Sequence, residues 1–252
     1  MRIVSIHAHP DDAEILAGGT LALLAEAGHE ITIVTMTPGD GGSATLPPDE
    51  IAAVRREEAR KSAAIIGAAY RCAEFRDMSI FNDDGSRRRV TEIVRWARPG
   101  IVLTASPADY HCDHEATSAL VTDACFAASV PNYQVPGAVP PLPAIPHLYY
   151  MDSIGGTDRF GRIIEPDFVT DVSSTFETKR QMLASHSSQQ EWLKEQHGIE
   201  DPLEAMERWT RDRGALVHIN LGEGFRRYPG HPYPQTPLLE ELLGAKAIIH
   251  SR

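Results

Sequence analysis

The stretch Ile3-Val4-Ser5-Ile6-His7-Ala8-His9-Pro10-Asp11-Asp12 decides the fold, because an apolar run passes within a few residues into an imidazole and two carboxylates. This order predicts a buried strand that ends in a loop carrying reactive side chains. A second apolar run at 101–104 is followed in the same way by His111-Cys112-Asp113-His114. In an open α/β sheet, ligands and catalytic groups gather at the C-terminal ends of the strands. The two clusters are therefore expected to converge on one point.

The first half of the chain alternates short β-rich runs with longer helical patterns, which predicts a doubly wound sheet. Strands are expected at 3–7, 31–36, 72–75 and from 101, and helices at 13–27, 48–66, 91–97 and from beyond His114 to about 128. The expected fold class is a Rossmann-like α/β fold with a mainly parallel sheet and helices on both faces.

The second half opens with six prolines between 130 and 146, which predict an extended excursion without a helix or a central strand. Strands are expected at 148–151 and 168–172, followed by a helix from about Thr175 that Ser173 or Ser174 would cap. The polar stretch from about 190 to 213 is expected to be a C-terminal extension of one or two surface helices. We expect residues 1–252 to form one domain, with the Pro-rich stretch as an insertion.

The composition excludes several classes of protein. A formal net charge of −11 over 252 residues disfavours nucleic-acid binding, which usually selects a basic face. Three widely spaced cysteines without a C-x-x-C pair argue against a disulfide framework and a structural zinc ribbon. The chain enters its expected first strand at once, without a secretory signal, and has no run near the roughly 20 apolar residues that span a bilayer. A cytoplasmic protein without a membrane span is expected.

The two clusters carry the chemistry of a metal site. Two histidines and one aspartate with an open coordination position suit a catalytic zinc ion. We therefore expect a metal-dependent enzyme. A dinucleotide-binding protein would share the sheet pattern, but the loop after the first strand lacks a G-x-G-x-x-G fingerprint.

Motifs spread over most of the chain resemble one family. They are HPDDAE at 9–14, GGT at 18–20, RREE at 55–58, IG at 66–67, HCDH at 111–114, Lys179, HSSQ at 186–189 and GEGFR at 222–226. This set is similar to that of the zinc-dependent N-deacetylases that include the LmbE-like proteins, the bacillithiol- and mycothiol-pathway deacetylases and the N-acetylglucosaminyl-phosphatidylinositol (PIG-L) de-N-acetylases. The family usually has proline where this chain has Cys112.

The resemblance implies that His9, Asp12 and His114 are the metal ligands, for Zn²⁺ or for Fe²⁺ or another divalent ion. Alone, His9 would be read as a core or helix-entry histidine and Asp12 as a helix N-cap. Asp11 stands beside the ligands, where its carboxylate could take a proton from the attacking water and act as general base. The alternative for Asp11 is a carboxylate that only orients a ligand.

The resemblance also implies that His111 faces the substrate. As an imidazolium it could stabilise an oxyanion and protonate the departing amine, with Asp113 holding its ring and keeping it charged. In a second scheme, Asp11 performs both proton transfers and His111 acts only electrostatically. The sequence leaves both schemes open.

Three further residues are candidates for binding the substrate. Arg55 could hold sugar hydroxyls or a phosphate, or could pair with Glu58 on the helix surface. Asp40 could accept bonds from sugar hydroxyls or cap a turn. His186 is expected to lie in the pocket or behind the ligands. Trp192 and Trp209 are alternative sugar-stacking candidates, although packing is the simpler interpretation.

We therefore expect a hydrolase that removes the N-acetyl group from an N-acetylglucosamine-type sugar or conjugate and releases acetate and a free amine. A wider amidase acting on thiol-sugar conjugates or acylated glycosides is an alternative. A metal-binding module without turnover is another, although such a module has no need for Asp11. The expected partner is a small amino-sugar, and relatives in the family imply a homo-oligomer, either a trimer or a hexamer.

Overall fold

The computed structural model of the protein describes residues 1–189, 192 and 201–250. Within these residues the strands join one eight-stranded sheet of order β3-β2-β1-β4-β5-β7-β6-β8. The strands are β1 (Arg2–His7), β2 (Glu30–Thr35), β3 (Ala69–Cys72), β4 (Ile101–Thr104), β5 (His147–Met151), β6 (Phe168–Asp171), β7 (Gly222–Arg227) and β8 (Ala247–Ile249).

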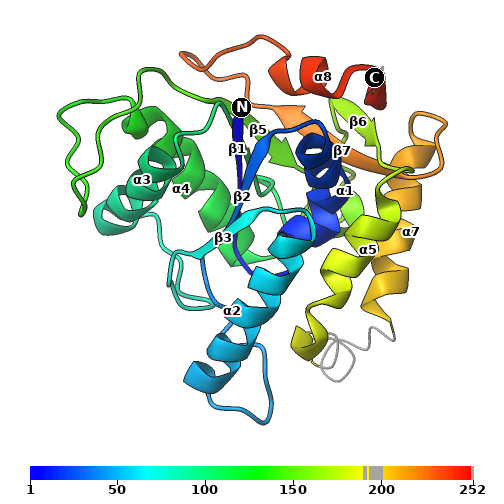
Figure 1. Ribbon diagram of the computed structural model, residues 1–252, viewed down its shortest axis with the longest axis horizontal. Helices are drawn as coiled ribbons and strands as arrows, with labels where there is room; N and C mark the ends of the chain where they lie inside the picture. The colour runs from blue at the N-terminus through cyan, green and yellow to red at the C-terminus, as the bar shows by residue number, and fades with distance from the viewer. Residues whose placement is uncertain (190–191, 193–200, 251–252) are drawn as a thin grey trace.

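Helices cover both faces of this sheet (Figure 1). They are α1 (Asp12–Glu26), α2 (Pro48–Ile65), α3 (Asp84–Ala97), α4 (Cys112–Ala128), α5 (Phe176–Ala184), α7 (Pro202–Ala215) and α8 (Leu238–Leu243), with the 3-10 turns η1 (Ile154–Gly156) and η2 (Gly244–Lys246). In Figure 1, α3 and α4 lie on one side of the sheet, and α1, α2 and α5 lie on the other. None of the helices described is both long and apolar enough to cross a membrane.

The parallel half of the sheet consists of β3, β2, β1, β4 and β5. Successive side chains of a strand point to opposite faces, and β1 follows this rule. Val4 and Ile6 pack into the core beneath α3 and α4, whereas Ile3 packs beneath α1. Because both faces are covered, the strands are apolar almost throughout. The predicted doubly wound, mainly parallel sheet is confirmed.

The other half of the sheet is antiparallel. β7 lies between β5 and β6 and runs antiparallel to both, and β8 pairs antiparallel with β6 at the edge. The segment 222–226 was expected only as a motif, and the central strand there was not predicted. Its two glycines make the local sequence untypical of a strand, and its pairing with β5 joins residues far apart along the chain.

Several element boundaries differ from the prediction. β3 ends at Cys72, where a strand was expected to begin. α3 starts seven residues earlier than expected, because the Asp83 side chain accepts a hydrogen bond from the backbone N–H of Ser86 and caps it. The N-cap of α5 is Thr175, and the expected caps Ser173 and Ser174 are wrong.

The two unusual stretches of the second half have different outcomes. Residues 130–146 contain no helix or strand, as predicted from the prolines. Of the expected extension at 190–213, residues 190–191 and 193–200 lie outside the described part of the chain. Residues 202–213 belong to α7, whose Ala205 and Met206 are buried, so this helix is not simply a surface element.

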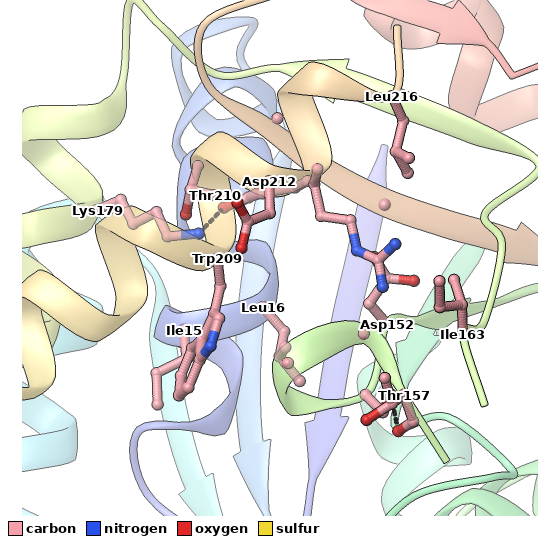
Figure 2. Close-up of a pocket in the computed structure, with 17 residues that line it drawn as sticks. Ile15, Leu16, Asp152, Thr157, Ile163, Lys179, Trp209, Thr210, Asp212 and Leu216 are labelled. Carbon is pink, nitrogen blue, oxygen red and sulfur yellow. Dashed lines mark hydrogen bonds and ion pairs between the residues drawn. The ribbon is translucent and has the colours of Figure 1, made fainter. Parts of the chain in front are cut away.

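A buried ion pair joins three elements on the α1 side of the sheet. Lys179 of α5 donates to Glu223 of β7 over 2.6 Å, and both side chains are at least 98% buried. Glu223 also accepts hydrogen bonds from the backbone N–H groups of Gly19 and Thr20 in α1. Thr175 adds a hydrogen bond from its hydroxyl to the carbonyl of Gly19. The contacts hold α1 against β7 and α5, with Lys179 visible in Figure 2.

Replacement of Lys179 by methionine is expected to lower the free energy of unfolding by about 3–5 kcal/mol, because it leaves the Glu223 charge buried without its partner. Urea denaturation measures the change. Arg211→Met is the control, because Arg211 forms a surface pair with Glu207 of the kind that contributes about 0–1 kcal/mol. Equal losses in the two variants would contradict a special role for the buried pair.

Candidate active site

The side chains of His9, Asp12 and His114 meet at the C-terminal edge of the parallel strands. His9 follows β1, Asp12 is the first residue of α1, and His114 lies in the first turn of α4. One carboxylate oxygen of Asp12 is 3.5 Å from Nδ1 of His9, and the other is 3.4 Å from Nε2 of His114. The backbone N–H of His9 also donates to Asp12 over 2.8 Å. The Asp12 carboxylate therefore lies between the two imidazoles.

Each imidazole also contacts a further carboxylate through its outer nitrogen, and the two rings use different aspartates. Nε2 of His9 is 3.2 Å from Oδ2 of Asp113, and Nδ1 of His114 is 3.0 Å from Oδ1 of Asp109. Metal-ligating histidines commonly give their outer N–H to such a carboxylate, which orients the ring and sets the tautomer. The arrangement leaves Nδ1 of His9 and Nε2 of His114 facing Asp12.

This donor set fits a divalent cation. Ligands bonded at about 2.0–2.1 Å to a tetrahedral zinc lie about 3.3 Å apart, close to the two separations between Asp12 and the imidazoles. Donor atoms of His9, His111 and His114 also lie within 4.8 Å of one another. The cluster, with Asp113 beside it, could hold a metal ion.

The electrostatics of these residues agree with a site built for positive charge. Burial disfavours a charged His9, but hydrogen bonds to Asp113 and Asp12 outweigh it and raise its pKa to about 9. Burial also disfavours a charged Asp12, yet His114 and His9 hold the pKa of this carboxyl well below its ordinary range. The carboxylates thus favour positive charge at the centre of the cluster. Without a metal ion the protonated imidazoles carry this charge, and a bound divalent ion would supply it instead.

Asp11 lies at the N-cap of α1 in a strained backbone conformation. Its φ of 104° is in the left-handed region, and its side chain does not cap the helix. Strain of this kind concentrates at functional sites, where surrounding contacts maintain it. Burial and the neighbouring Asp12 carboxylate raise the pKa of Asp11 to about 7, against the pull of Arg55 and His186. The side chain lines a cavity together with the three residues described above.

His111 is the N-cap of α4. Its Nδ1 accepts a hydrogen bond from the backbone N–H of Asp113 over 3.1 Å, so a neutral ring carries its proton on Nε2. The Asp113 carboxylate contacts His9 and the backbone of Met78 instead. Burial, His9 and His114 lower the pKa of His111. The nearby Asp113 carboxylate raises the pKa of His111, but less than burial and the two neighbouring histidines lower it, and the expected support of the His111 ring by Asp113 stays a prediction.

The cavity beside this cluster has a volume of about 310 Å³. His9, Asp11, Asp12, His111 and His114 form its polar side. Arg55, Asp77 and Gln189 add further polar groups, and aromatic and apolar side chains line the cavity as well, among them Met78, Tyr110, Ile154, Trp192, Ala205 and Trp209. Both tryptophans named as stacking candidates therefore line the cavity. Convergent polar groups beside apolar and aromatic side chains are typical of a binding site for a small molecule.

Comparison with known proteins identifies the family. Residues 4–125, from β1 through most of α4, match the family described as PIG-L: GlcNAc-PI de-N-acetylase. The chain carries a PIG-L family domain. The match includes both clusters that meet in the cavity.

Proteins similar to this chain in sequence or structure include deacetylases and a hydratase. The chain is 28% identical to the diacetylchitobiose deacetylase of Thermococcus kodakarensis over 239 residues, which cover 91% of this chain and 84% of that protein. The structure resembles the N,N'-diacetylchitobiose deacetylase of Pyrococcus horikoshii with a TM-score of 0.76 and 25% identity, covering 94% of this chain and 88% of that chain. It also resembles GalB, the 4-carboxy-2-hydroxymuconate hydratase of Pseudomonas putida, with a TM-score of 0.75, 22% identity and coverage of 93% and 99%. The last likeness shows the fold alone.

Arg55 lines the cavity of the PIG-L domain and also holds two loops together. Its guanidinium donates to the carbonyls of Gly39 and Pro10 over 3.1 Å each. At Gly39, φ is +77°, and a Cβ there would collide with the guanidinium. Glu58, the alternative partner considered for Arg55, instead accepts hydrogen bonds from Ser187 and Ser188. Arg55 is thus positioned beside Asp11 by backbone contacts.

Asp40 and His186 are placed outside the lining of the cavity. Asp40 accepts hydrogen bonds from Arg76 and from the backbone N–H of Asp77, so both of its oxygens are engaged. His186 is 1% exposed and contacts Glu14 over 3.1 Å. Both oxygens of Asp40 and the Nε2 atom of His186 are thus engaged by other residues, whereas the buried Nδ1 of His186 has no hydrogen-bond partner among the described residues. Their roles in binding the substrate stay predictions.

A second cavity of about 200 Å³ adjoins the first, and Figure 2 shows the residues around it. Ile15 and Trp209 line both cavities. Asp152 and Arg213 face each other in the second one, where the Arg213 Nε lies 2.7 Å from a carboxylate oxygen of Asp152. The wall between the two cavities therefore includes one of the tryptophans.

Sequence reasoning missed Asp109, Asp77 and Tyr110. Asp109 holds His114, and Asp77 and Tyr110 line the cavity. Asp109 and Tyr110 directly precede the HCDH cluster, and this closeness in sequence was the one feature from which they could have been predicted. Asp77 follows the short strand β3, whose end reaches the same edge of the sheet.

Asp109→Asn is expected to weaken binding of a divalent metal ion about 10–100-fold, because a neutral amide lacks the negative charge of the carboxylate that contacts Nδ1 of His114. The amide oxygen can still accept the backbone N–H of His111, which keeps the loop in place. Competition with a chelator measures the affinity. Asp123→Asn, at an exposed position of α4, is the control. Unchanged affinity in Asp109→Asn would remove Asp109 from the support of the metal site.

Proposed function

We propose that this protein is a zinc-dependent N-deacetylase of an N-acetylglucosamine-type sugar or conjugate. The observation that carries the proposal is the position of Asp12 between two imidazoles, each fixed from behind by a second carboxylate, next to the buried Asp11. His9, Asp12 and His114 would hold the ion. A divalent cation there polarises an amide carbonyl and lowers the pKa of a water molecule. Fe²⁺ would suit the same nitrogen and oxygen donors.

Asp11 is the proposed general base. Its side chain lines the cavity beside the three donors, where it can accept a proton from the attacking water. Attack on the amide carbon gives a tetrahedral oxyanion. Asp11 then returns the proton to the nitrogen, and the carbon–nitrogen bond breaks to release acetate and a free amine.

His111 is proposed to stabilise the oxyanion as a neutral hydrogen-bond donor. The backbone N–H of Asp113 occupies its Nδ1, which leaves the proton on Nε2 for the substrate oxygen. This favours the scheme in which Asp11 performs both proton transfers and His111 acts only electrostatically. Asp113 and Asp109 are positioning residues, because they act through His9 and His114.

An amino-sugar substrate agrees with the wall of the cavity and with the relatives. Tyr110, Trp192 and Trp209 offer flat apolar surfaces for the face of a sugar ring, and Arg55 offers a guanidinium. Two similar proteins are named as deacetylases of diacetylchitobiose. A hydratase shares the fold, so addition of water to a carbon–carbon double bond is the competing reaction that the assay must include.

The decisive assay follows amine release from N-acetylglucosamine and N,N'-diacetylchitobiose by metal-stripped protein with and without zinc. Release that depends on zinc is the expected result. A parallel arm offers an unsaturated hydroxy-dicarboxylic acid and follows loss of its absorbance. Turnover in that arm alone would replace the deacetylase with a hydratase. Zinc binding without turnover in either arm would favour a metal-binding module.

Asp11→Asn is expected to bind zinc like the wild type but to lose about 10²–10⁴-fold in turnover, because an amide cannot accept the proton of water. Metal content and amine release are measured on the same preparation. His114→Ala is the companion variant and is expected to lose metal. Asp49→Asn, at an exposed position of α2, is the control. Normal turnover in Asp11→Asn would overturn its assignment as the base.

A further inference from the structure

Two sulfur atoms lie next to each other beside the cavity. The thiol of Cys112, the first residue of α4, is free and exposed, and its Sγ is 3.9 Å from Sδ of Met78. Met78 belongs to the segment that follows β3, and its side chain is 64% exposed. The backbone N–H of Met78 donates to Oδ2 of Asp113 over 2.7 Å, which ties this segment to the first turn of α4. This contact fixes the backbone of Met78 next to Cys112 and keeps the two sulfur-bearing side chains within reach of each other.

Two further donors surround the thiol. Oδ1 of Asp113 is 3.9 Å from Sγ of Cys112, while the other oxygen of this carboxylate contacts His9 and Met78. His111, Cys112 and Asp113 each offer a donor atom, and these atoms lie within 4.8 Å of one another. A thiol, an imidazole and a carboxylate thus lie close together, and the thioether of Met78 lies beside the thiol.

The spacing matches that of ligands around one ion. Two sulfurs bonded at about 2.3 Å to a tetrahedral zinc lie about 3.8 Å apart. The 3.9 Å separation of the Cys112 and Met78 sulfurs is close to this edge. A sulfur and a carboxylate oxygen on the same ion lie about 3.6 Å apart, slightly less than the 3.9 Å between Cys112 and Asp113. Sulfur donors select thiophilic d¹⁰ ions such as Zn²⁺ and Cu⁺ over the ions that oxygen donors prefer.

We propose that Cys112, Met78 and Asp113, with His111 as fourth donor, form a second metal site for a thiophilic d¹⁰ cation. It is distinct from the site of His9, Asp12 and His114, which has only nitrogen and oxygen donors. Binding converts the Cys112 thiol into a thiolate, and the proton passes to solvent. Met78 and His111 line the cavity, so the ion would sit at its rim.

Occupation of the second site would oppose the proposed deacetylation. The ion would take the imidazole of His111 and one oxygen of Asp113, and these residues stabilise the oxyanion and orient His9 in the proposed mechanism. This consequence rests on the proposed function, whereas the binding itself does not. The first equivalent of zinc would activate the protein and a second thiophilic equivalent would inhibit it.

The test titrates Cd²⁺ into the full chain already loaded with one equivalent of zinc, and follows heat and the ultraviolet absorption of a cadmium–thiolate bond. The wild type is expected to bind cadmium with one thiolate band. Cys112→Ser is expected to lose that band, and Met78→Leu to bind more weakly. Cys72→Ser is the control, because Cys72 is the other thiol that is not fully buried. Exchange of cadmium into the His9 site gives no such band, since that site lacks sulfur.

The second site would be overturned if Cys112→Ser kept the cadmium–thiolate band of the wild type. Loss of this band in Cys72→Ser rather than in Cys112→Ser would overturn it as well. Amine release is followed in parallel, and each protein is compared with its own rate at one equivalent of zinc. The second equivalent is expected to inhibit the wild type but not Cys112→Ser. No amine release at all would refute the deacetylase while the thiolate band still decides the metal site. Amine release without a thiolate band would support the deacetylase and refute the second metal site.

Discussion

The Glu223 carboxylate is the contact on which the placement of α1 depends. It accepts the ammonium of Lys179 and two backbone N–H groups of α1, so three elements that are distant in sequence share one buried charge. A buried carboxylate is tolerated only when its partners satisfy it. Since Asp12 is the first residue of α1, the contact also sets where that carboxylate stands relative to β4 and α4.

The candidate metal site is ordered by the same principle of paired charges. In a chain of net charge −11, Asp12, Asp109 and Asp113 converge on two imidazoles. Their mutual repulsion is balanced only by positive charge at the centre. Asp11 stands slightly apart, in a strained conformation that keeps its carboxylate from capping α1 and leaves it facing the cavity. The orientation of the two imidazoles and the negative charge around them are thus set by the folded chain itself.

The doubly wound half of the sheet could be predicted because β1, β2, β4 and β5 are recognisable from local sequence, whereas the short strand β3 was expected three residues too late. Apolar runs end in Gly-rich or charged loops, and helical patterns lie between them. The antiparallel half could not, since β7 contains two glycines and is a strand only through its neighbours β5 and β6. Likewise, the sequence left Arg55 either as a substrate contact or as a partner of Glu58, and its binding to two backbone carbonyls follows from the meeting of two loops.

The sequence by itself determined which side chains stand at the ends of β1 and β4, because strand ends and helix starts follow from local patterns of apolar and capping residues. Only the tertiary structure decided which carboxylate meets which imidazole. Asp113 contacts His9, which is 104 residues away, rather than the nearby ring of His111. Asp40 and His186 carry suitable functional groups but are bound by other residues. The direction of a side chain depends on the order and packing of the strands, and no local pattern encodes that order.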